Sequence, residues 1–357
     1  MHPYVAIVCM GYIFSFLVIF SKIDKKVLFL ILLISIILVD GLRWEMGVDW
    51  ESYRLWFYGK PMTGVEFGFR FYVQLISSLT NNYSIFIFLT AIIVYVGNLG
   101  LLFYSTRSLV AVTFVLSTLP WYSGSMRQFI ASGFVVGALY ALTLGKKWRF
   151  LLLILMGSSF HITAFFMIAF LYFYGLHPLY MIFLLLVSFP IIIFLFRFLG
   201  DLGPLLEIVF ASEKDFSNRL NVNEGASEAT NPVLGFLRKV YSFSVPIFFA
   251  VTSSRILGNK KILFYGGVSA FSFLMYVVGV NYMQLLASRM SYYFSVLAFS
   301  FFIGFLDREL KGRTNRVVLL LFVISVSAIT YSRMTEFSLF YPYSSVFYNT
   351  NLGRELY

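Results

Sequence analysis

The sequence has little of what soluble and disulfide-linked proteins need. Only 12% of its 357 residues are charged, and it contains a single cysteine, Cys9. A soluble globule of this length needs far more polar surface, so a soluble enzyme is excluded. One cysteine also excludes a disulfide scaffold and a zinc site built from several cysteines. The sequence lacks a Gly-x-x-x-x-Gly-Lys-[Ser/Thr] loop for ATP and an Asp-x-Asp pair for a metal-held nucleotide sugar, so we expect no cofactor and no metal.

Apolar sequence is abundant instead: it makes up 60% of the residues and lies in long unbroken runs. A hydrocarbon core of about 30 Å takes about 20 apolar residues in helical form. Membrane β-barrels alternate polar and apolar residues, so the unbroken runs favour helices. We therefore predict an all-α polytopic integral membrane protein with a single transmembrane domain over residues 1–357. The predicted spans lie near residues 3–20, 27–42, 83–103, 108–122, 128–144, 178–198, 236–252, 262–281, 291–306 and 317–331, with a broken pair over 150–174.

Loop charges orient these spans, because short loops rich in lysine and arginine stay in the cytoplasm. The loops of this kind lie at residues 22–26, 146–149, 255–261 and 308–316. The segments left outside are residues 43–82, predicted as an outer loop with a motif and a short helix, then 123–127, 282–290 and both termini.

A polar segment at residues 200–235 must also lie outside, as an outer polar loop, which requires an odd number of crossings between Lys147 and Asp201. Two helices, 150–174 and 178–198, give an even number. We therefore predict a break in the first helix at Ser158-Ser159-Phe160-His161. The break gives two short crossings, about twelve crossings in all, and an outer position for His161.

This topology places ten arginines but only three lysines outside. Positive charge is disfavoured there, and the planar arginine fork makes two-point contacts with phosphate oxygens that lysine does not reproduce. The arginine set therefore suggests an anionic lipid headgroup or a diphosphate. The alternative is solvated loop charge, which we favour for four of them: Arg54, Arg70, Arg219 and Arg354.

The densest polar cluster begins after the second predicted span. Arg43 and Asp49 flank Gly47, which permits a tight turn that brings the two side chains together. The stretch also carries aromatic faces that suit either the membrane interface or a sugar ring: Trp44, Trp50 and Tyr53. An interfacial anchor with a local ion pair is the alternative interpretation.

Two further arginines stand at outer helix starts, where free backbone N–H groups and the helix dipole favour an anion. Arg127 and Gln128 follow Ser123-Gly124-Ser125, and Arg289 precedes Tyr293 by one turn. A capped helix start with a snorkelling arginine is the alternative.

His161 lies within a membrane stretch, where histidine is rare and is a functional candidate by default. It accepts a proton near neutral pH, as a general base must, although a buried structural histidine is the alternative. Tyr343, in Phe340-Tyr341-Pro342-Tyr343, is interpreted either as an aromatic lip over a cavity or as an interfacial turn.

Taken in order, these motifs resemble the EpsG family, a branch of the Wzy-type polysaccharide polymerases. The series covers nearly the whole chain: Arg43…Gly47-x-Asp49…Tyr53, Arg127-Gln128-x-Ile130-Ala131, Phe160-His161-x-Thr163-Ala164, Arg289-x-x-x-Tyr293-Phe294 and Tyr341-Pro342-Tyr343. Val48 is a mild departure, because the family often has a small hydroxyl residue before the aspartate.

The resemblance implies a multi-pass protein of the bacterial inner membrane with a GT-C-like helical fold and an active site on the periplasmic or outer side. The implied reaction is a metal-independent glycosyl transfer from undecaprenyl diphosphate to the non-reducing end of another lipid-linked repeat unit. Expected partners are undecaprenyl-diphosphate-linked oligosaccharides, membrane lipid and a chain-length regulator. Nucleic acid is not expected, because the net charge of +11 is spread through membrane loops.

In such a reaction, arginines aimed at the departing diphosphate would stabilise the charge that develops on it. The predicted diphosphate-binding residues are Arg127 and Arg289, with Arg43 and Gln128 assisting. His161 is the first candidate for the general base and Asp49 the second. The predicted sugar-binding residues are aromatic: Trp44, Trp50, Tyr53, Tyr293 and Tyr343.

Three other functions remain open at this stage. A transporter or flippase for lipid-linked saccharides would also use arginines, but it predicts a basic path through the membrane and repeated halves. An O-antigen ligase would share the donor and use a lipid A core as acceptor. A membrane acyltransferase would share the membrane histidine.

Overall fold

The computed structural model describes residues 2–47, 49–117, 125–174, 245, 248–249, 259–282, 292–334 and 343–347. Within these ranges every named element is a helix, and strand pairing is limited to one isolated bridge between Arg43 and Ser345. The helices are α1 (Pro3–Phe20), α2 (Lys25–Gly41), α3 (Trp50–Phe57), α4 (Phe67–Leu79), α5 (Tyr83–Tyr95), η1 (Val96–Gly100), α6 (Leu101–Thr106), α7 (Leu109–Leu116), α8 (Met126–Thr143), α9 (Lys147–Phe160), η3 (Ile162–Ile168), α10 (Ala169–Phe173), α15 (Lys260–Tyr282), η4 (Tyr292–Leu297), α17 (Ala298–Glu309) and α18 (Arg313–Met334).

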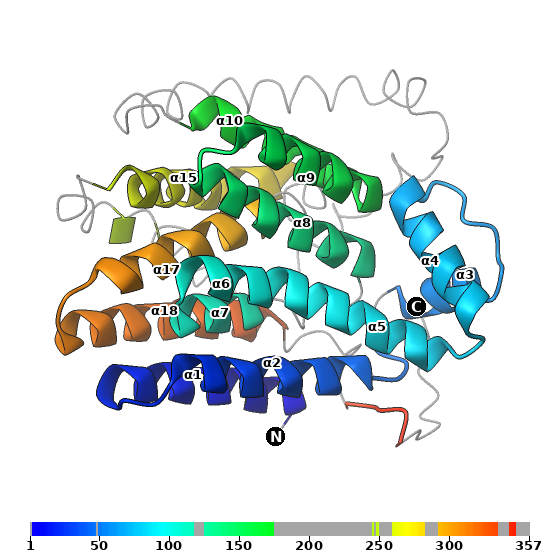
Figure 1. The fold of residues 1–357 in the computed structure, drawn as a ribbon, viewed down its shortest axis with the longest axis horizontal. Helices are drawn as coiled ribbons and strands as arrows, with labels where there is room; N and C mark the ends of the chain where they lie inside the picture. The colour runs from blue at the N-terminus through cyan, green and yellow to red at the C-terminus, as the bar shows by residue number, and fades with distance from the viewer. Residues whose placement is uncertain are drawn as a thin grey trace.

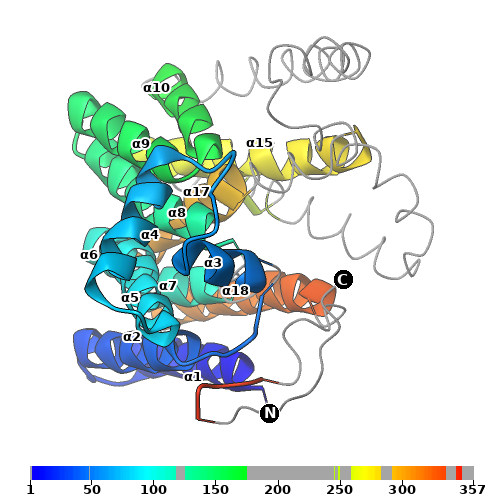
Figure 2. The ribbon, with the colours of Figure 1, turned by 90° about the vertical axis from the view of Figure 1, so that its right-hand side faces the viewer.

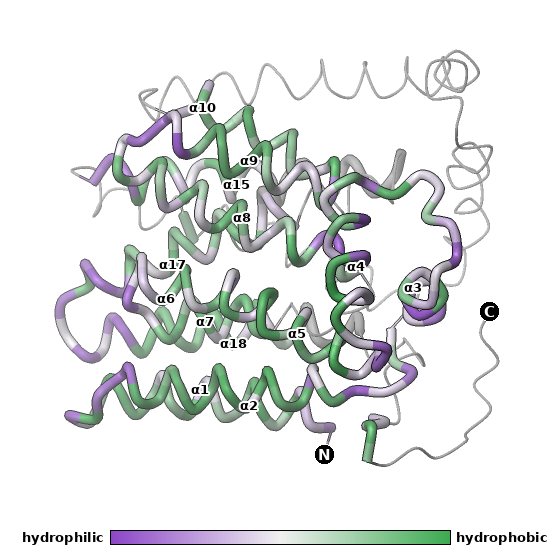
Figure 3. Tube along the Cα trace, turned by 45° about the vertical axis from the view of Figure 1, so that its right-hand side comes forward, coloured by the Kyte–Doolittle hydropathy of each residue, from purple (hydrophilic) through white to green (hydrophobic). Residues whose placement is uncertain are grey.

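The longer helices lie side by side and form one bundle (Figure 1). Between α-helices, the most extensive contacts join α8 to α9, α15 to α17, α2 to α5, and α1 to α7. Hydrophilic residues gather at the two ends of these helices and hydrophobic residues line the length between them (Figure 3). This distribution matches a layer of hydrocarbon with water on both sides.

Three helical stretches of the described chain are long and apolar enough to cross a membrane: Pro3–Phe20, Tyr83–Thr106 and Met126–Thr143. The all-α character that the sequence predicts is therefore confirmed for the described residues. The number of twelve crossings and the GT-C-like arrangement stay predictions. The expected span at 178–198 and the expected outer loop at 200–235 lie outside the described residues, as does most of the span at 236–252.

Local sequence explains where several helices begin. Asp24 caps α2 by accepting a hydrogen bond from the backbone N–H of Lys26, and Asn82 caps α5 in the same way. Ser108 caps α7 through the N–H of Ala111, and Pro3 stands in the first turn of α1, where its missing N–H costs nothing. These caps supply acceptors for N–H groups that the helices themselves leave unpaired.

The longest of these stretches, residues 83–106, is locked against α8 by a buried amide. The Asn98 Nδ2 donates to the backbone oxygens of Val94 and Phe129, at 2.8 and 3.0 Å, and Ser132 Oγ donates to Asn98 Oδ1 at 2.7 Å. Because an unsatisfied amide is costly away from water, this network fixes how the two helices sit together. It thereby fixes the position of the α8 start, which carries Arg127.

The predicted helix break at His161 is confirmed. Helix α9 ends at Phe160, His161 has extended backbone angles, and the 3₁₀ helix η3 begins at Ile162. The η3 segment packs back against α9 and α8. The chain therefore reverses beside His161, while whether each short half crosses the membrane stays a prediction.

Residues 43–82, expected to contain one short helix, form two. Helices α3 and α4 lie together at one end of the bundle, which faces the viewer in Figure 2. At Gly68, a Cβ atom would lie only 2.8 Å from the backbone oxygen of Ser159, so glycine alone allows α4 to approach the end of α9 this closely. Segment 43–82 is thus packed onto the bundle end where α9 turns at His161.

Candidate active site

Arg127, the second residue of α8, is the centre of a cluster at the end of the bundle that carries α3 and α4. Its Nη1 donates to Glu66 Oε2 at 2.7 Å, and the ring of Trp56 lies 5.7 Å from its guanidinium carbon. The side chains of Arg127 and Glu66 are 22% and 18% exposed, so the pair is partly shielded and partly open to solvent. A cation held on an aromatic face in this way is positioned as well as paired.

Glu66 connects this arginine to the turn at His161. Its second carboxylate oxygen, Oε1, accepts a hydrogen bond from the backbone N–H of Ile162 at 3.2 Å. Arg127, Glu66 and the residue after His161 therefore form one chain of polar contacts across α8, α4 and η3. The structure brings together two residues that the sequence analysis selected independently, Arg127 and His161.

His161 is 5% exposed. Its Nδ1 lies 2.6 Å from Thr163 Oγ1, in the Phe-His-x-Thr-Ala motif. Its backbone N–H donates to Gly157 at 3.0 Å and its carbonyl accepts from Ala164 at 3.0 Å, so the backbone at the break is held on both sides. A hydrogen bond at one ring nitrogen sets the orientation of an imidazole, which a proton acceptor requires.

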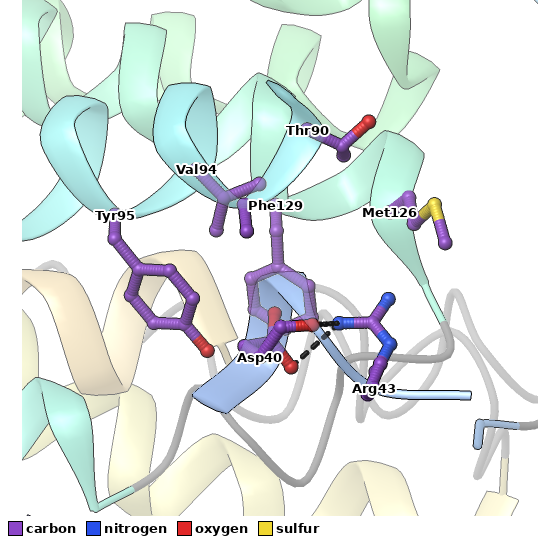
Figure 4. Close-up of a pocket in the computed structure, with 8 residues that line it drawn as sticks. Asp40, Arg43, Thr90, Val94, Tyr95, Met126 and Phe129 are labelled. Atoms are coloured by element: carbon purple, nitrogen blue, oxygen red, sulfur yellow. Dashed lines mark hydrogen bonds and ion pairs between the residues drawn. The ribbon is translucent and has the colours of Figure 1, made fainter. Parts of the chain in front are cut away.

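Arg43 is buried against an acid that the sequence analysis missed. Its Nη1 lies 2.5 Å from Asp40 Oδ1, and the Tyr4 hydroxyl donates to the same carboxylate at 2.6 Å. Arg43 and Asp40 line a small pocket with Met126 and Phe129 of α8, and they point toward one another in Figure 4. The pocket places Arg43 next to the start of α8.

Asp49 and Tyr53 lie at the start of α3 and join the cluster around Arg127. The Tyr53 hydroxyl is 3.5 Å from Asp49 Oδ2, and Tyr53 is almost fully buried. Burial raises the pKa of the Tyr53 phenol well above its usual value, the Asp49 charge raises it further, and Arg127 lowers it. The turn before α3 uses Gly47 at a φ of 106°, as the sequence predicts.

The two tryptophans of the motif pack edge to face, with ring centroids 5.6 Å apart and an interplanar angle of 69°. Trp50 also meets Tyr83 at 5.0 Å. The indole N–H groups of Trp44 and Trp50 are buried without a hydrogen-bond partner. Buried donors of this kind suit an acceptor such as a sugar hydroxyl.

Tyr343 and the residues after it attach a late part of the chain to the Arg43 turn. The Tyr343 hydroxyl donates to the Val39 backbone oxygen at 2.7 Å, and the backbone N–H of Trp44 donates to the Ser344 backbone oxygen at 3.0 Å. The Val346 N–H donates to the Leu42 oxygen at 2.9 Å. The short segment 343–347, red in Figure 2, lies beside the N-terminal end of α1, and the Tyr343 ring meets the Tyr4 ring edge-on at 6.1 Å.

Gln128 and Tyr293 are both buried in the bundle, and the Tyr293 hydroxyl donates to the Gln128 backbone oxygen at 3.4 Å. This contact places Tyr293 beside the start of α8. Arg289 itself lies outside the described residues, as do Ser123, Gly124, Tyr341 and Pro342.

Two acids of this end of the bundle were not foreseen. Asp40 had a usable signal, because a carboxylate inside a predicted membrane span (27–42) is a functional candidate by default. Glu66 had none, since it stands in an ordinary polar loop and its two partners are distant in sequence.

The described structure thus defines a class: an all-α membrane protein that gathers arginine, histidine, carboxylate and aromatic side chains at one end of its helices. Comparison with protein families goes further, because the EpsG family matches residues 26–345. The chain belongs to the EpsG family. Family and apolar helices together indicate a membrane protein of the polysaccharide-polymerase type, with glycosyltransferase-like chemistry. No curated protein and no solved structure matches the chain significantly.

Proposed function

We propose that this protein polymerises polysaccharide repeat units at the outer face of the bacterial inner membrane. The donor is a glycan on undecaprenyl diphosphate, and the acceptor is the non-reducing end of a second lipid-linked repeat unit. The observation that carries the proposal is the chain of polar contacts Arg127–Glu66–Ile162. It connects Arg127, which is predicted to bind the diphosphate, to the turn that carries His161, the predicted base. Family membership gives the reaction class.

In the proposed reaction, an acceptor hydroxyl oxygen attacks the anomeric carbon of the donor sugar. The bond between that carbon and the diphosphate oxygen breaks, and undecaprenyl diphosphate leaves with the bonding electrons. The hydroxyl proton passes to His161, with Asp49 as the second candidate. The diphosphate linkage supplies the driving force, so the step needs neither ATP nor a metal.

Positive charge near the leaving group is the main contribution that we assign to the protein. Arg127 would contact the diphosphate directly, and Arg289, Arg43 and Gln128 would assist. Preorganised donors aimed at developing charge are among the largest contributions to catalysis, at about 10²–10³ in rate for one donor. The buried ion pair with Asp40 gives Arg43 a fixed position from which its charge acts.

Sugar binding is assigned to the aromatic residues of the same end. Trp44 and Trp50 offer aromatic rings and buried indole N–H donors, and Tyr53 adjoins Arg127. Tyr343 and Tyr293 contact the same end of the bundle from late parts of the chain. Aromatic faces of this kind bind the apolar side of a pyranose while polar groups select its hydroxyls.

The test is a reconstitution with a single substrate. Purified protein in lipid vesicles receives only undecaprenyl-diphosphate repeat units, and products are separated by chain length. Multimers, with release of undecaprenyl diphosphate, are expected. Movement of the lipid-linked glycan across the bilayer without new glycosidic bonds would identify a flippase. Transfer that requires an added lipid A core would identify a ligase.

A further inference from the structure

The contact between Arg127 and Glu66 uses only part of the guanidinium. Arg127 Nη1 donates to Glu66 Oε2, whereas Arg127 Nε is buried and has no hydrogen-bond partner. The neighbouring pair Arg54–Glu51 differs: there Nε and Nη2 both donate, at 3.0 and 2.9 Å, to the two oxygens of one carboxylate. Arg127 therefore keeps a donor for another anion.

Glu66 is itself bound as an anion by donors from two different elements. Its two oxygens take one hydrogen bond from Arg127 in α8 and one from the backbone N–H of Ile162 in η3. A guanidinium and a backbone amide converging on one anionic group is the arrangement by which proteins hold phosphate oxygens.

We propose that the Glu66 carboxylate occupies the subsite of one phosphate of the lipid diphosphate, and that the diphosphate displaces it from Arg127 and Ile162. This inference rests on the proposed function, because it takes the ligand of Arg127 to be a lipid diphosphate. Glu66 is then a competing anion that the substrate replaces. The Ile162 N–H becomes a diphosphate donor beside His161.

The exchange is favourable for two physical reasons. A diphosphate has more charge and more acceptor oxygens than a carboxylate, so it also reaches Arg127 Nε. Glu66 is the N-cap residue of α4, and its side chain makes no capping hydrogen bond in the structure. Once displaced from Arg127 and Ile162, the carboxylate is free to make one. The first N–H groups of a helix have no partner within it, and the helix dipole favours a carboxylate there.

The same exchange in reverse assists product release. Undecaprenyl diphosphate leaves the subsite as the Glu66 carboxylate returns to Arg127 and Ile162. Removing the carboxylate is therefore expected to strengthen binding of the product and to slow turnover. A purely structural acid gives the opposite result, since its loss would weaken the site.

The experiment measures binding of undecaprenyl diphosphate to the purified full-length protein by calorimetry. Glu66→Gln keeps the size and the acceptor for Ile162 but removes the negative charge, and we expect at least tenfold tighter binding. Glu51→Gln is the matched control, because it removes the same charge from a carboxylate in segment 43–82 that already accepts two hydrogen bonds from Arg54. We expect it to change binding less than twofold.

The gain must also depend on Arg127. In an Arg127→Lys background, Glu66→Gln is expected to change the affinity less than twofold. If the Gln variant does not purify, Glu66→Asp replaces it: the shorter acid does not span both donors, so tighter binding is again expected. Unchanged or weaker binding in the Gln or Asp variant would overturn the proposal, and so would an equal gain in Glu51→Gln.

Failure of this inference and failure of the proposed function give different results. If wild-type protein polymerises repeat units but Glu66→Gln binds the product more weakly, the exchange is wrong and the polymerase stands. If wild-type protein forms no polymer but Glu66→Gln still gains affinity through Arg127, the subsite stands and the polymerase is wrong.

Discussion

Replacing Gly68 with alanine tests whether the contact between α4 and the end of α9 positions the active site. A Cβ atom at residue 68 would lie 2.8 Å from the Ser159 backbone oxygen and 2.9 Å from its carbonyl carbon. An ordinary contact begins at 3.4 Å, so α4 and Ser159 must separate by 3.4 minus 2.8, about 0.6 Å. Overpacking of this kind costs about 1–3 kcal/mol.

The same separation reaches the site, because Glu66 stands two residues before Gly68. Its hydrogen bond to the Ile162 N–H is 3.2 Å long, and adding 0.6 Å gives about 3.8 Å, which is no longer a hydrogen bond. A displacement of about 1 Å in a positioned group costs about 10²-fold in rate. We therefore expect Gly68→Ala to lower polymer formation by about tenfold.

The assay combines a thermal unfolding midpoint in detergent with polymer yield from repeat units. Gly100→Ala is the matched control, since a Cβ there meets nothing closer than 3.7 Å, at Val96. In a helix this exchange is expected to be neutral or stabilising by up to about 1 kcal/mol. A Gly68→Ala protein with the midpoint and the polymer yield of wild type would refute the reasoning.

Three further predictions concern charge and proton transfer. Arg127→Lys keeps the positive charge but loses the planar guanidinium, so polymer ladders on gels are expected to shorten or disappear at normal expression. Ladders like those of the wild type would show that Arg127 does not bind the diphosphate. His161→Ala is expected to abolish chain growth in the same assay, and full-length polymer would exclude it as the base. Asp40→Asn removes the carboxylate that pairs with the buried Arg43. Breaking a buried ion pair from one side typically costs about 3–5 kcal/mol, so we expect a much lower thermal midpoint. An unchanged midpoint would show that the pair does not hold this turn.

The helical character of the described chain follows from composition, because hydrocarbon leaves few alternatives to a helix for a long apolar run. The break at His161 was also predictable, because the loop charges required an odd number of membrane crossings between Lys147 and Asp201. The second short helix in residues 43–82 was not, since α4 depends on its packing against Ser159 through Gly68.

Within the candidate site, the sequence did not predict which side chains pair with the selected arginines. Arg43 was expected to meet Asp49 across the Gly47 turn, and the structure gives it Asp40, three residues earlier on the last turn of α2. A pair at this spacing is local, so the carboxylate within the predicted span could have revealed it. The Arg127–Glu66 contact joins residues 61 apart in sequence, and no local pattern encodes such a pair.

The attachment of Tyr343 and Ser344 to the Arg43 turn has a consequence for biosynthesis. The hydrogen bond from Tyr343 to Val39 spans 304 residues, so the ribosome completes one side of the turn long before the other exists. The early helices must therefore enter the bilayer while the backbone groups of Leu42 and Trp44 still lack their partners in the late segment. The turn that carries Arg43 would then reach its final form only when translation has delivered this late segment.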